Sequence, residues 1–91
     1  MKTDNVLRIA VLGAGNWARF AHIPGWKRDQ RSEVAVICDP RKERAEEFAQ
    51  MFDIPEFSDD WQETVARDDI DVVDICTPSN THFELSLAAL E

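Results

Sequence analysis

The sequence predicts an α/β fold in which a parallel sheet carries helices on both faces. Three short apolar runs, at residues 6–12, 34–38 and 72–76, have the composition of strands that are buried on both sides. Segments with helical periodicity separate these runs, and alternation of strand and helix is typical of βαβ units. With 91 residues, the chain is predicted to form one domain over residues 1–91.

The first strand leads into a turn rich in glycine. Residues 6–12 run directly into Gly13-Ala14-Gly15, which predicts a tight turn, and a helix is expected over residues 16–23. Pro24-Gly25 is predicted to end or kink this helix, because proline lacks a backbone donor and clashes with the preceding helical turn.

The second strand, residues 34–38, is followed by Asp39-Pro40. This pair predicts the start of a helix with proline at its first helical position. The apolar residues that follow recur at i, i+3, i+4 and i+7, which places them on one stripe of that helix. They are Ala45, Phe48, Ala49 and Phe52.

A weaker strand and helix are expected before the third apolar run. Residues 54–57 predict a very short strand, and residues 60–67 predict a helix with Asp60 as its N-cap. Trp61 and Val65 of this helix are expected to face inward.

The strand at 72–76 is followed by a turn at 77–80 and by a last helix that opens with the capping-box spacing of residues 81–84. The expected strand order is 3-2-1-4. Because the sequence stops within a helical pattern at Glu91, we expect a Rossmann-like sheet that is incomplete, truncated after the fourth strand and its helix.

Charge and composition exclude several classes of protein. The formal net charge of −8 argues against nucleic acid or an anionic membrane surface as a partner. The charge is unevenly divided, because residues 1–42 carry an excess of basic side chains and residues 43–91 a large excess of acidic ones. An anionic ligand is therefore expected in the N-terminal half.

No apolar run approaches the roughly 18–20 residues that cross a bilayer, and residues 1–7 do not resemble a signal peptide. Two cysteines, Cys38 and Cys76, are too few for a disulfide scaffold, so we expect a cytoplasmic protein with reduced thiols. The spacing of Cys and His matches no zinc motif, and no metal site is predicted.

Residues 13–18 fit the pattern G-x-G-x-x-G/A between a buried strand and a helix. Gly13 allows the tight turn, Gly15 lets a pyrophosphate approach the backbone, and Ala18 is small enough for close helix packing. Amides of the first helical turn would then bind the phosphates. The alternative is a plain strand-to-helix turn that uses glycine for its backbone freedom.

Asp39 lies 21 positions after Ala18, close to the spacing of about 20 at which an acidic residue binds the adenosine ribose. A carboxylate there accepts hydrogen bonds from the ribose hydroxyls and repels a 2′-phosphate, which favours NAD. Asp39 is also a good N-cap, which is the competing interpretation. Arg41 is a second candidate cofactor residue that could stack on adenine or meet a 2′-phosphate, so NADP is the alternative cofactor.

The loop at residues 77–82 follows the third strong strand. Ligands of doubly wound sheets bind beyond the carboxyl ends of the strands, where strand order reverses. This loop is expected there, beside the glycine turn. An ordinary proline turn with a helix cap explains the same residues equally well.

Three segments together resemble the N-terminal domain of the glucose–fructose oxidoreductase and inositol dehydrogenase (Gfo/Idh/MocA) family. They are residues 13–24, Cys38-Asp39 and residues 71–82, and the likeness covers essentially the whole chain. The resemblance implies that Gly13, Gly15, Asn16 and Trp17 surround the cofactor pyrophosphate and that Thr77, Pro78, Asn80 and His82 line its nicotinamide half. Ser79 stands where the family typically has asparagine, so either Ser79 replaces that residue or Asn80 serves from the next position.

The resemblance also implies an NAD(P)-dependent oxidoreductase that acts on a sugar, polyol or related alcohol. Family members continue into a Glu-Lys-Pro motif with a catalytic lysine and a second domain that binds substrate, and neither is found in the 91 residues. No catalytic residue is therefore predicted, His22 is interpreted as structural, and a small-molecule substrate is expected only with the second domain. The alternatives are a non-catalytic dinucleotide-binding module or an inactive truncated product.

In such a fragment the strand at 72–76 would lack a partner on one edge. Open N–H and C=O groups on an apolar strand favour association. The chain is therefore expected to be marginally stable, to self-associate, or to be ordered only as part of a longer protein.

Overall fold

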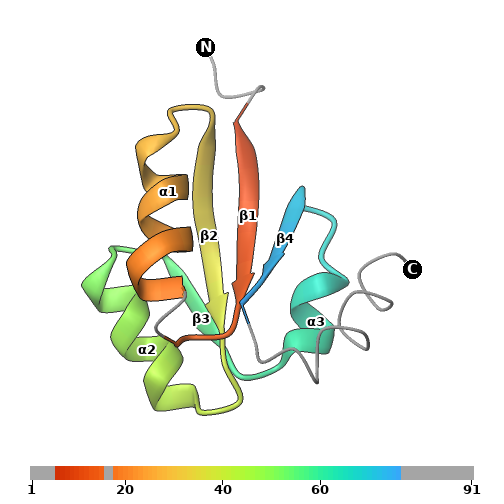
Figure 1. The fold of residues 1–91 in the computed structure, drawn as a ribbon. Helices are drawn as coiled ribbons and strands as arrows, with labels where there is room; N and C mark the ends of the chain where they lie inside the picture. The colour runs from red at the N-terminus through yellow and green to blue at the C-terminus, as the bar shows by residue number, and fades with distance from the viewer. Residues whose placement is uncertain (1–5, 16–17, 77–91) are drawn as a thin grey trace.

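The computed structural model describes residues 6–15 and 18–76, which form a four-stranded parallel sheet (Figure 1). The order of the strands is β3-β2-β1-β4, which confirms the predicted order. Their bounds are Leu7–Leu12 for β1, Ser32–Cys38 for β2, Glu56–Ser58 for β3 and Val72–Ile75 for β4. All four carboxyl ends therefore lie along the same edge of the sheet.

Helices cover both faces of the sheet, as the sequence predicts. A π-helical turn, Ala18–His22, continues into α1 (Ile23–Arg28), which lies with α2 (Lys42–Met51) on one face, while α3 (Trp61–Val65) lies on the other (Figure 1).

Two apolar clusters match these two layers. The first includes Ile9, Val11, Ile23 and Phe48, and the second joins Leu12 and Cys38 to the partly buried Trp61, Val65, Val73 and Ile75. Alternate residues of β1 thus face opposite layers, as a strand buried on both sides requires.

A β-bulge changes the alternation in β2. Ile9 pairs with Val34 but Ala10 pairs with Val36, so Ala35 has no partner in β1. As a result Val34 and Ile37, three residues apart, both join the cluster beneath α1 and α2. The bulge therefore inserts one extra residue into β2 without lengthening β1, and it shifts the residue that faces this layer from Val36 to Ile37.

The prediction that Pro24-Gly25 ends the first helix is wrong, while the alternative of a kink stays a prediction. Helical backbone continues through both residues to Arg28. Pro24 lies in the first turn of α1, where the α-helical segment needs no donor from it, and the preceding π-helical turn accommodates the change in hydrogen bonding.

The predicted start of α2 is also wrong. The helix begins at Lys42 with Arg41 as its N-cap, so Asp39 and Pro40 lie outside it. Instead of capping the helix, the Asp39 carboxylate accepts hydrogen bonds from the Ala14 and Arg41 N–H groups. The predicted apolar stripe is confirmed, since Ala45, Phe48 and Ala49 are buried, with Phe52 partly buried just beyond the helix.

The shorter elements differ from their predicted bounds by a few residues. The strand expected at 54–57 occurs at Glu56–Ser58, and the helix expected at 60–67 ends at Val65. Its predicted cap is confirmed, because the Asp60 side chain accepts a hydrogen bond from the Glu63 N–H at 3.0 Å. The expected last helix lies outside the described residues.

Asp74 joins the first helix to the edge of the described sheet. Its Oδ2 lies 2.7 Å from Nδ1 of His22 and accepts a hydrogen bond of 2.7 Å from the Trp26 indole N–H. The Cys76 thiol is also hydrogen-bonded to Asp74. The side chain of Asp74 is only 12% exposed, so these donors replace the water that it gives up on folding. This arrangement supports the structural interpretation of His22.

Cys38 ends β2 and Cys76 directly follows β4, two strands on opposite sides of β1, and both residues are free thiols. Burial raises the pKa of Cys38 to about 11, although a hydrogen bond with Thr64 opposes the shift. Burial, with a further contribution from Asp74, raises the pKa of Cys76 to about 12. Neither thiol is therefore ionised near neutral pH.

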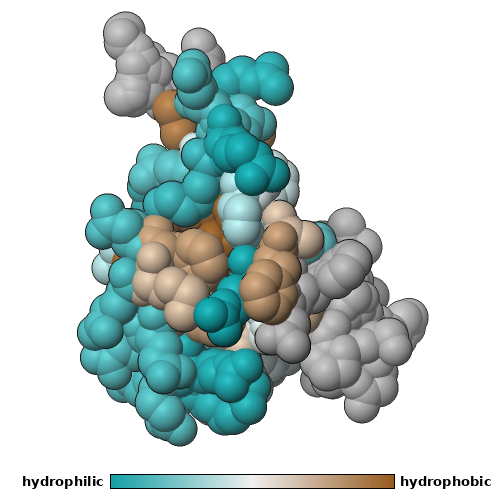
Figure 2. Space-filling model, turned by 60° about the vertical axis from the view of Figure 1, so that its left-hand side comes forward, coloured by the Kyte–Doolittle hydropathy of each residue, from teal (hydrophilic) through white to brown (hydrophobic). Residues whose placement is uncertain are grey.

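The side that carries α1 and α2 is largely hydrophilic around a central apolar area (Figure 2). Phe20 lies on the first helical segment, which is the π-helical turn together with α1 (Ala18–Arg28), and is 71% exposed. Met51 lies on α2 and is 51% exposed. No helix within residues 6–15 and 18–76 is long and apolar enough to cross a membrane.

We expect Asp74→Asn to lower the free energy of unfolding by about 1–3 kcal/mol, because the amide that replaces one oxygen cannot accept the same N–H donors. Urea denaturation followed by circular dichroism measures the change. Asp68→Asn, at an exposed position, is the matched control. Equal stability of the Asp74 variant and the control would contradict the structural role of Asp74.

We expect both cysteines to react slowly with iodoacetamide at pH 8. A rise in pKa from 9.0 to about 11 lowers the thiolate fraction of Cys38 about 100-fold, and the larger shift at Cys76 lowers it further. Mass spectrometry would compare labelling of the native chain with labelling in urea. Equal rates would contradict the burial of these thiols.

We also expect the two cysteines to form no intramolecular disulfide. Two strand spacings amount to roughly 9–10 Å, which exceeds the separation of about 7 Å that a disulfide allows between Cα atoms. Detection of such a disulfide by mass spectrometry would contradict the strand order.

Candidate functional site

The turn after β1 lies at the carboxyl edge of the sheet. Gly13 is buried there with a φ of 110°, a backbone conformation that residues other than glycine rarely adopt. Its N–H donates to the Cys38 carbonyl at 2.7 Å, and the Cys76 N–H donates to the Leu12 carbonyl at 2.7 Å. The ends of β1, β2 and β4 therefore converge on this turn.

Gly15 differs from Gly13 because nothing in the described part of the chain requires a glycine there. Its φ lies outside the left-handed region, and a Cβ added to it would meet no described atom within 4 Å. Within the described residues its N–H has no hydrogen-bond acceptor. An open backbone surface with an unused donor is the feature that a phosphate group at a glycine turn requires. The residues present therefore fit a dinucleotide.

Asp39 lies immediately after β2, beside this turn, and is only 4% exposed. Its Oδ2 accepts a hydrogen bond from the Ala14 N–H at 2.8 Å, and its Oδ1 accepts one from the Arg41 N–H at 2.9 Å. The structure thus brings together two features that the sequence separates by more than twenty residues. Oδ2 keeps a further lone pair that can accept a hydroxyl donor, whereas the second lone pair of Oδ1 faces the Arg41 Nε at 3.3 Å.

Arg41 lies at the exposed side of Asp39. Its Nε is 3.3 Å from Asp39 Oδ1, while its side chain is 62% exposed. A pair in which the carboxylate is buried and the guanidinium faces solvent leaves the cation able to change its position at low cost.

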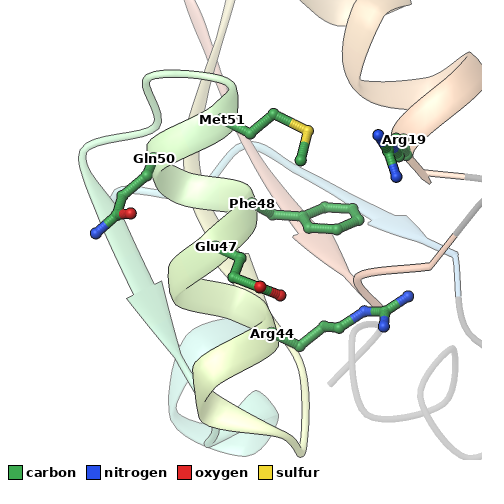
Figure 3. Close-up of a pocket in the computed structure, with 6 residues that line it drawn as sticks. All are labelled: Arg19, Arg44, Glu47, Phe48, Gln50 and Met51. Atoms are coloured by element: carbon green, nitrogen blue, oxygen red, sulfur yellow. The ribbon is translucent and has the colours of Figure 1, made fainter.

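Arg44 was not identified from the sequence. It extends from the first turn of α2, and its Nε donates to the Ala14 carbonyl at 2.9 Å. It lines a hollow of about 480 Å³ between the first helical segment and α2, together with Arg19, Phe48 and Met51 (Figure 3). An arginine within an acidic helix resembles an ordinary surface residue in sequence, so no local signal distinguishes it.

Six of the predicted cofactor residues lie outside the described residues. They are Asn16, Trp17, Thr77, Pro78, Asn80 and His82. Their roles remain predictions. The backbone at Cys76 lies next to the end of β1, since its N–H donates to Leu12 immediately before Gly13.

His22, Asp74 and Cys76 form a group that Cys and His spacing did not reveal. One potential ligand atom from each lies within 4.8 Å of the others. However, the Asp74 carboxylate already accepts hydrogen bonds from His22 and Trp26, so its charge is compensated without an ion. We therefore interpret this group as structural.

The sequence matches the model of an oxidoreductase family with an NAD-binding Rossmann fold over residues 7–91. The chain belongs to this family, the Gfo/Idh/MocA oxidoreductases. The match confirms the resemblance, the α/β fold class and an NAD(P)-type cofactor. It also agrees with the glycine turn and the buried acidic residue found after β1 and β2.

Two curated relatives and one solved structure illustrate the similarity. D-Glucoside 3-dehydrogenase of Escherichia coli is 33% identical over 98% of this chain, and scyllo-inositol 2-dehydrogenase (NAD⁺) of Bacillus subtilis is 32% identical over 97%. The 3-ketoreductase KijD10 of Actinomadura kijaniata, solved with NADP and TDP-benzene, covers 94% of this chain at 29% identity with a TM-score of 0.88. The chain spans about a quarter of the length of each.

The two glycines provide a matched pair of variants. We expect Gly15→Ala to leave the free energy of unfolding within about 0.5 kcal/mol of the original and to weaken NADH binding at least about tenfold, because a methyl group would occupy the space of the phosphate. We expect Gly13→Ala to lower stability by about 1–3 kcal/mol, because alanine is strained at this φ.

Urea denaturation and isothermal titration calorimetry with NADH measure the two effects. Gly25→Ala is a suitable control, since an added Cβ there also meets nothing within 4 Å but lies in α1, away from the turn. If Gly15→Ala bound NADH as tightly as this control, the assignment of the turn would be wrong.

Proposed function

We propose that the chain is the dinucleotide-binding portion of an NAD(P)-dependent oxidoreductase that acts on a sugar, polyol or related alcohol. The observation that carries this proposal is the hydrogen bond from the Ala14 N–H to the buried Asp39 carboxylate. It places the residue suited to ribose binding directly beside Gly15, whose open surface is suited to pyrophosphate. The adenosine ribose and the pyrophosphate of the cofactor would thus be recognised by one continuous surface.

When bound, the nicotinamide cofactor supplies the hydride chemistry. This chain would bind and orient the cofactor. Gly15 would offer its backbone N–H to phosphate, and Asp39 would accept hydrogen bonds from ribose hydroxyls. The loop at 77–82 is proposed, from the resemblance, to hold the nicotinamide half.

We propose that NAD is preferred over NADP. The Asp39 carboxylate is held in place by Ala14 and Arg41, so a 2′-phosphate entering the same position would meet a fixed negative charge. Arg41 is the opposing influence, because its exposed guanidinium is able to turn toward a phosphate. The anchored carboxylate favours NAD, since moving it would break its bond to the turn.

The substrate class is supported by the relatives, which include dehydrogenases of a glucoside and of an inositol. The resemblance assigns substrate binding and a catalytic lysine to segments beyond the glycine turn and its neighbouring strands. We therefore expect this chain by itself to bind the dinucleotide without oxidising polyols. Reduction of NAD by the isolated chain in the presence of polyols would contradict this expectation.

We expect the chain to bind NADH at least about fivefold more tightly than NADPH, which corresponds to about 1 kcal/mol of charge repulsion. Asp39→Ala should narrow this ratio, because it removes the fixed negative charge. Titration of each variant with both cofactors, followed by tryptophan fluorescence or calorimetry, measures the ratio.

Asp68→Ala, which removes an exposed carboxylate elsewhere, is the control for a general change in net charge. Equal affinity for NADH and NADPH in the unaltered chain would count against the proposed role of Asp39. Absence of binding to either cofactor would count against the proposed function as a whole.

A further inference from the structure

The middle residue of the glycine turn is held by side chains at both of its backbone polar groups. The Ala14 N–H donates to Asp39 Oδ2 at 2.8 Å, and the Ala14 carbonyl accepts a hydrogen bond from Arg44 Nε at 2.9 Å. Ala14 is fully buried, so these groups lie away from solvent. Asp39 directly follows β2, and Arg44 lies in the first turn of α2.

These two bonds fix two consecutive peptide planes. A trans peptide is planar, with its N–H and C=O pointing in opposite directions. The Ala14 N–H belongs to the plane shared with Gly13, and the Ala14 carbonyl belongs to the plane shared with Gly15. By holding this carbonyl, Arg44 directs the Gly15 N–H to the opposite side, away from itself.

The surroundings of Arg44 are consistent with this role. Its guanidinium carbon lies 5.9 Å from the centre of the Phe48 ring, which supports the half-buried side chain along α2. Figure 3 shows the side chain extending from α2 toward the end of β1. Within the described residues Arg44 forms no ion pair, and its side chain donates its hydrogen bond to the turn.

We propose that Arg44 is a positioning residue that aims the Gly15 N–H at the pyrophosphate of the dinucleotide. The proposal rests on the proposed function. It assigns to Arg44 no contact with the ligand, because its bond is to the opposite end of the peptide group. The turn would thus be preorganised before the cofactor arrives, which reduces the ordering that binding requires.

Three variants of the full chain distinguish the loss of the Arg44 hydrogen-bond donor from the loss of its positive charge. Glutamine places its side-chain Nε2 the same number of bonds from the backbone as arginine Nε, so Arg44→Gln keeps a donor for the Ala14 carbonyl and removes the charge. Arg44→Met has a similar length and no donor. Lys42→Met, at an exposed position in the same helical turn, controls for the loss of a nearby cation.

We expect Arg44→Met to bind NADH about tenfold more weakly, as expected for loss of a hydrogen bond from a charged donor. Arg44→Gln and Lys42→Met should bind within about twofold of the unaltered chain. In the absence of ligand, hydrogen exchange of the Gly15 amide should change only in Arg44→Met. The first readout is measured by calorimetry and the second by NMR.

Equal weakening in Arg44→Met and Arg44→Gln would overturn the proposal, since it would show that the charge contacts the ligand. Unchanged binding in Arg44→Met would also overturn it. If the unaltered chain did not bind NADH, the proposed function would fail, while hydrogen exchange at Gly15 would still decide whether Arg44 orders the turn.

Discussion

The hydrogen bond between the Asp39 carboxylate and the Ala14 N–H is the constraint on which the candidate site depends. It joins the end of β2 to the turn after β1 and excludes Asp39 from capping α2, which therefore begins at Lys42. A buried carboxylate is unfavourable unless donors compensate it. Here the backbone of the turn provides that compensation, so the stability of this edge and its proposed ability to bind a dinucleotide rest on the same atoms.

Asp74 illustrates the same principle within the sheet. It lies on β4 beside Val11, and its carboxylate accepts hydrogen bonds from two side chains of the first helical segment. In a chain with a net charge of −8, the buried carboxylate of Asp39 and the partly buried carboxylate of Asp74 are thus compensated by N–H donors. Asp39 orders the turn from the side of β2, and Asp74 ties the helix after that turn to β4.

Much of the fold followed from local sequence. The apolar runs and glycine turn predicted the parallel sheet and its order, because burial and backbone freedom leave direct signatures. The start of α2 was less predictable, since Asp39 has two possible roles and the choice between them depends on a distant partner, the Ala14 N–H. Arg44 and Asp74 had no local signature, because their contacts lie 30 and about 50 residues away. Long-range hydrogen bonds, rather than propensities, decided these positions.

The contrast between Gly13 and Gly15 separates the requirements of folding from those of binding. Gly13 adopts a backbone conformation that strains other residues, so the turn itself accounts for it. Gly15 has neither a left-handed φ nor a close neighbour among the described atoms, so the described part of the fold gives no reason for a missing side chain. The dinucleotide proposed to approach from outside would supply the reason. Because Asp39 and Arg44 hold the two peptide planes around Ala14, the donor at Gly15 is fixed before that group arrives.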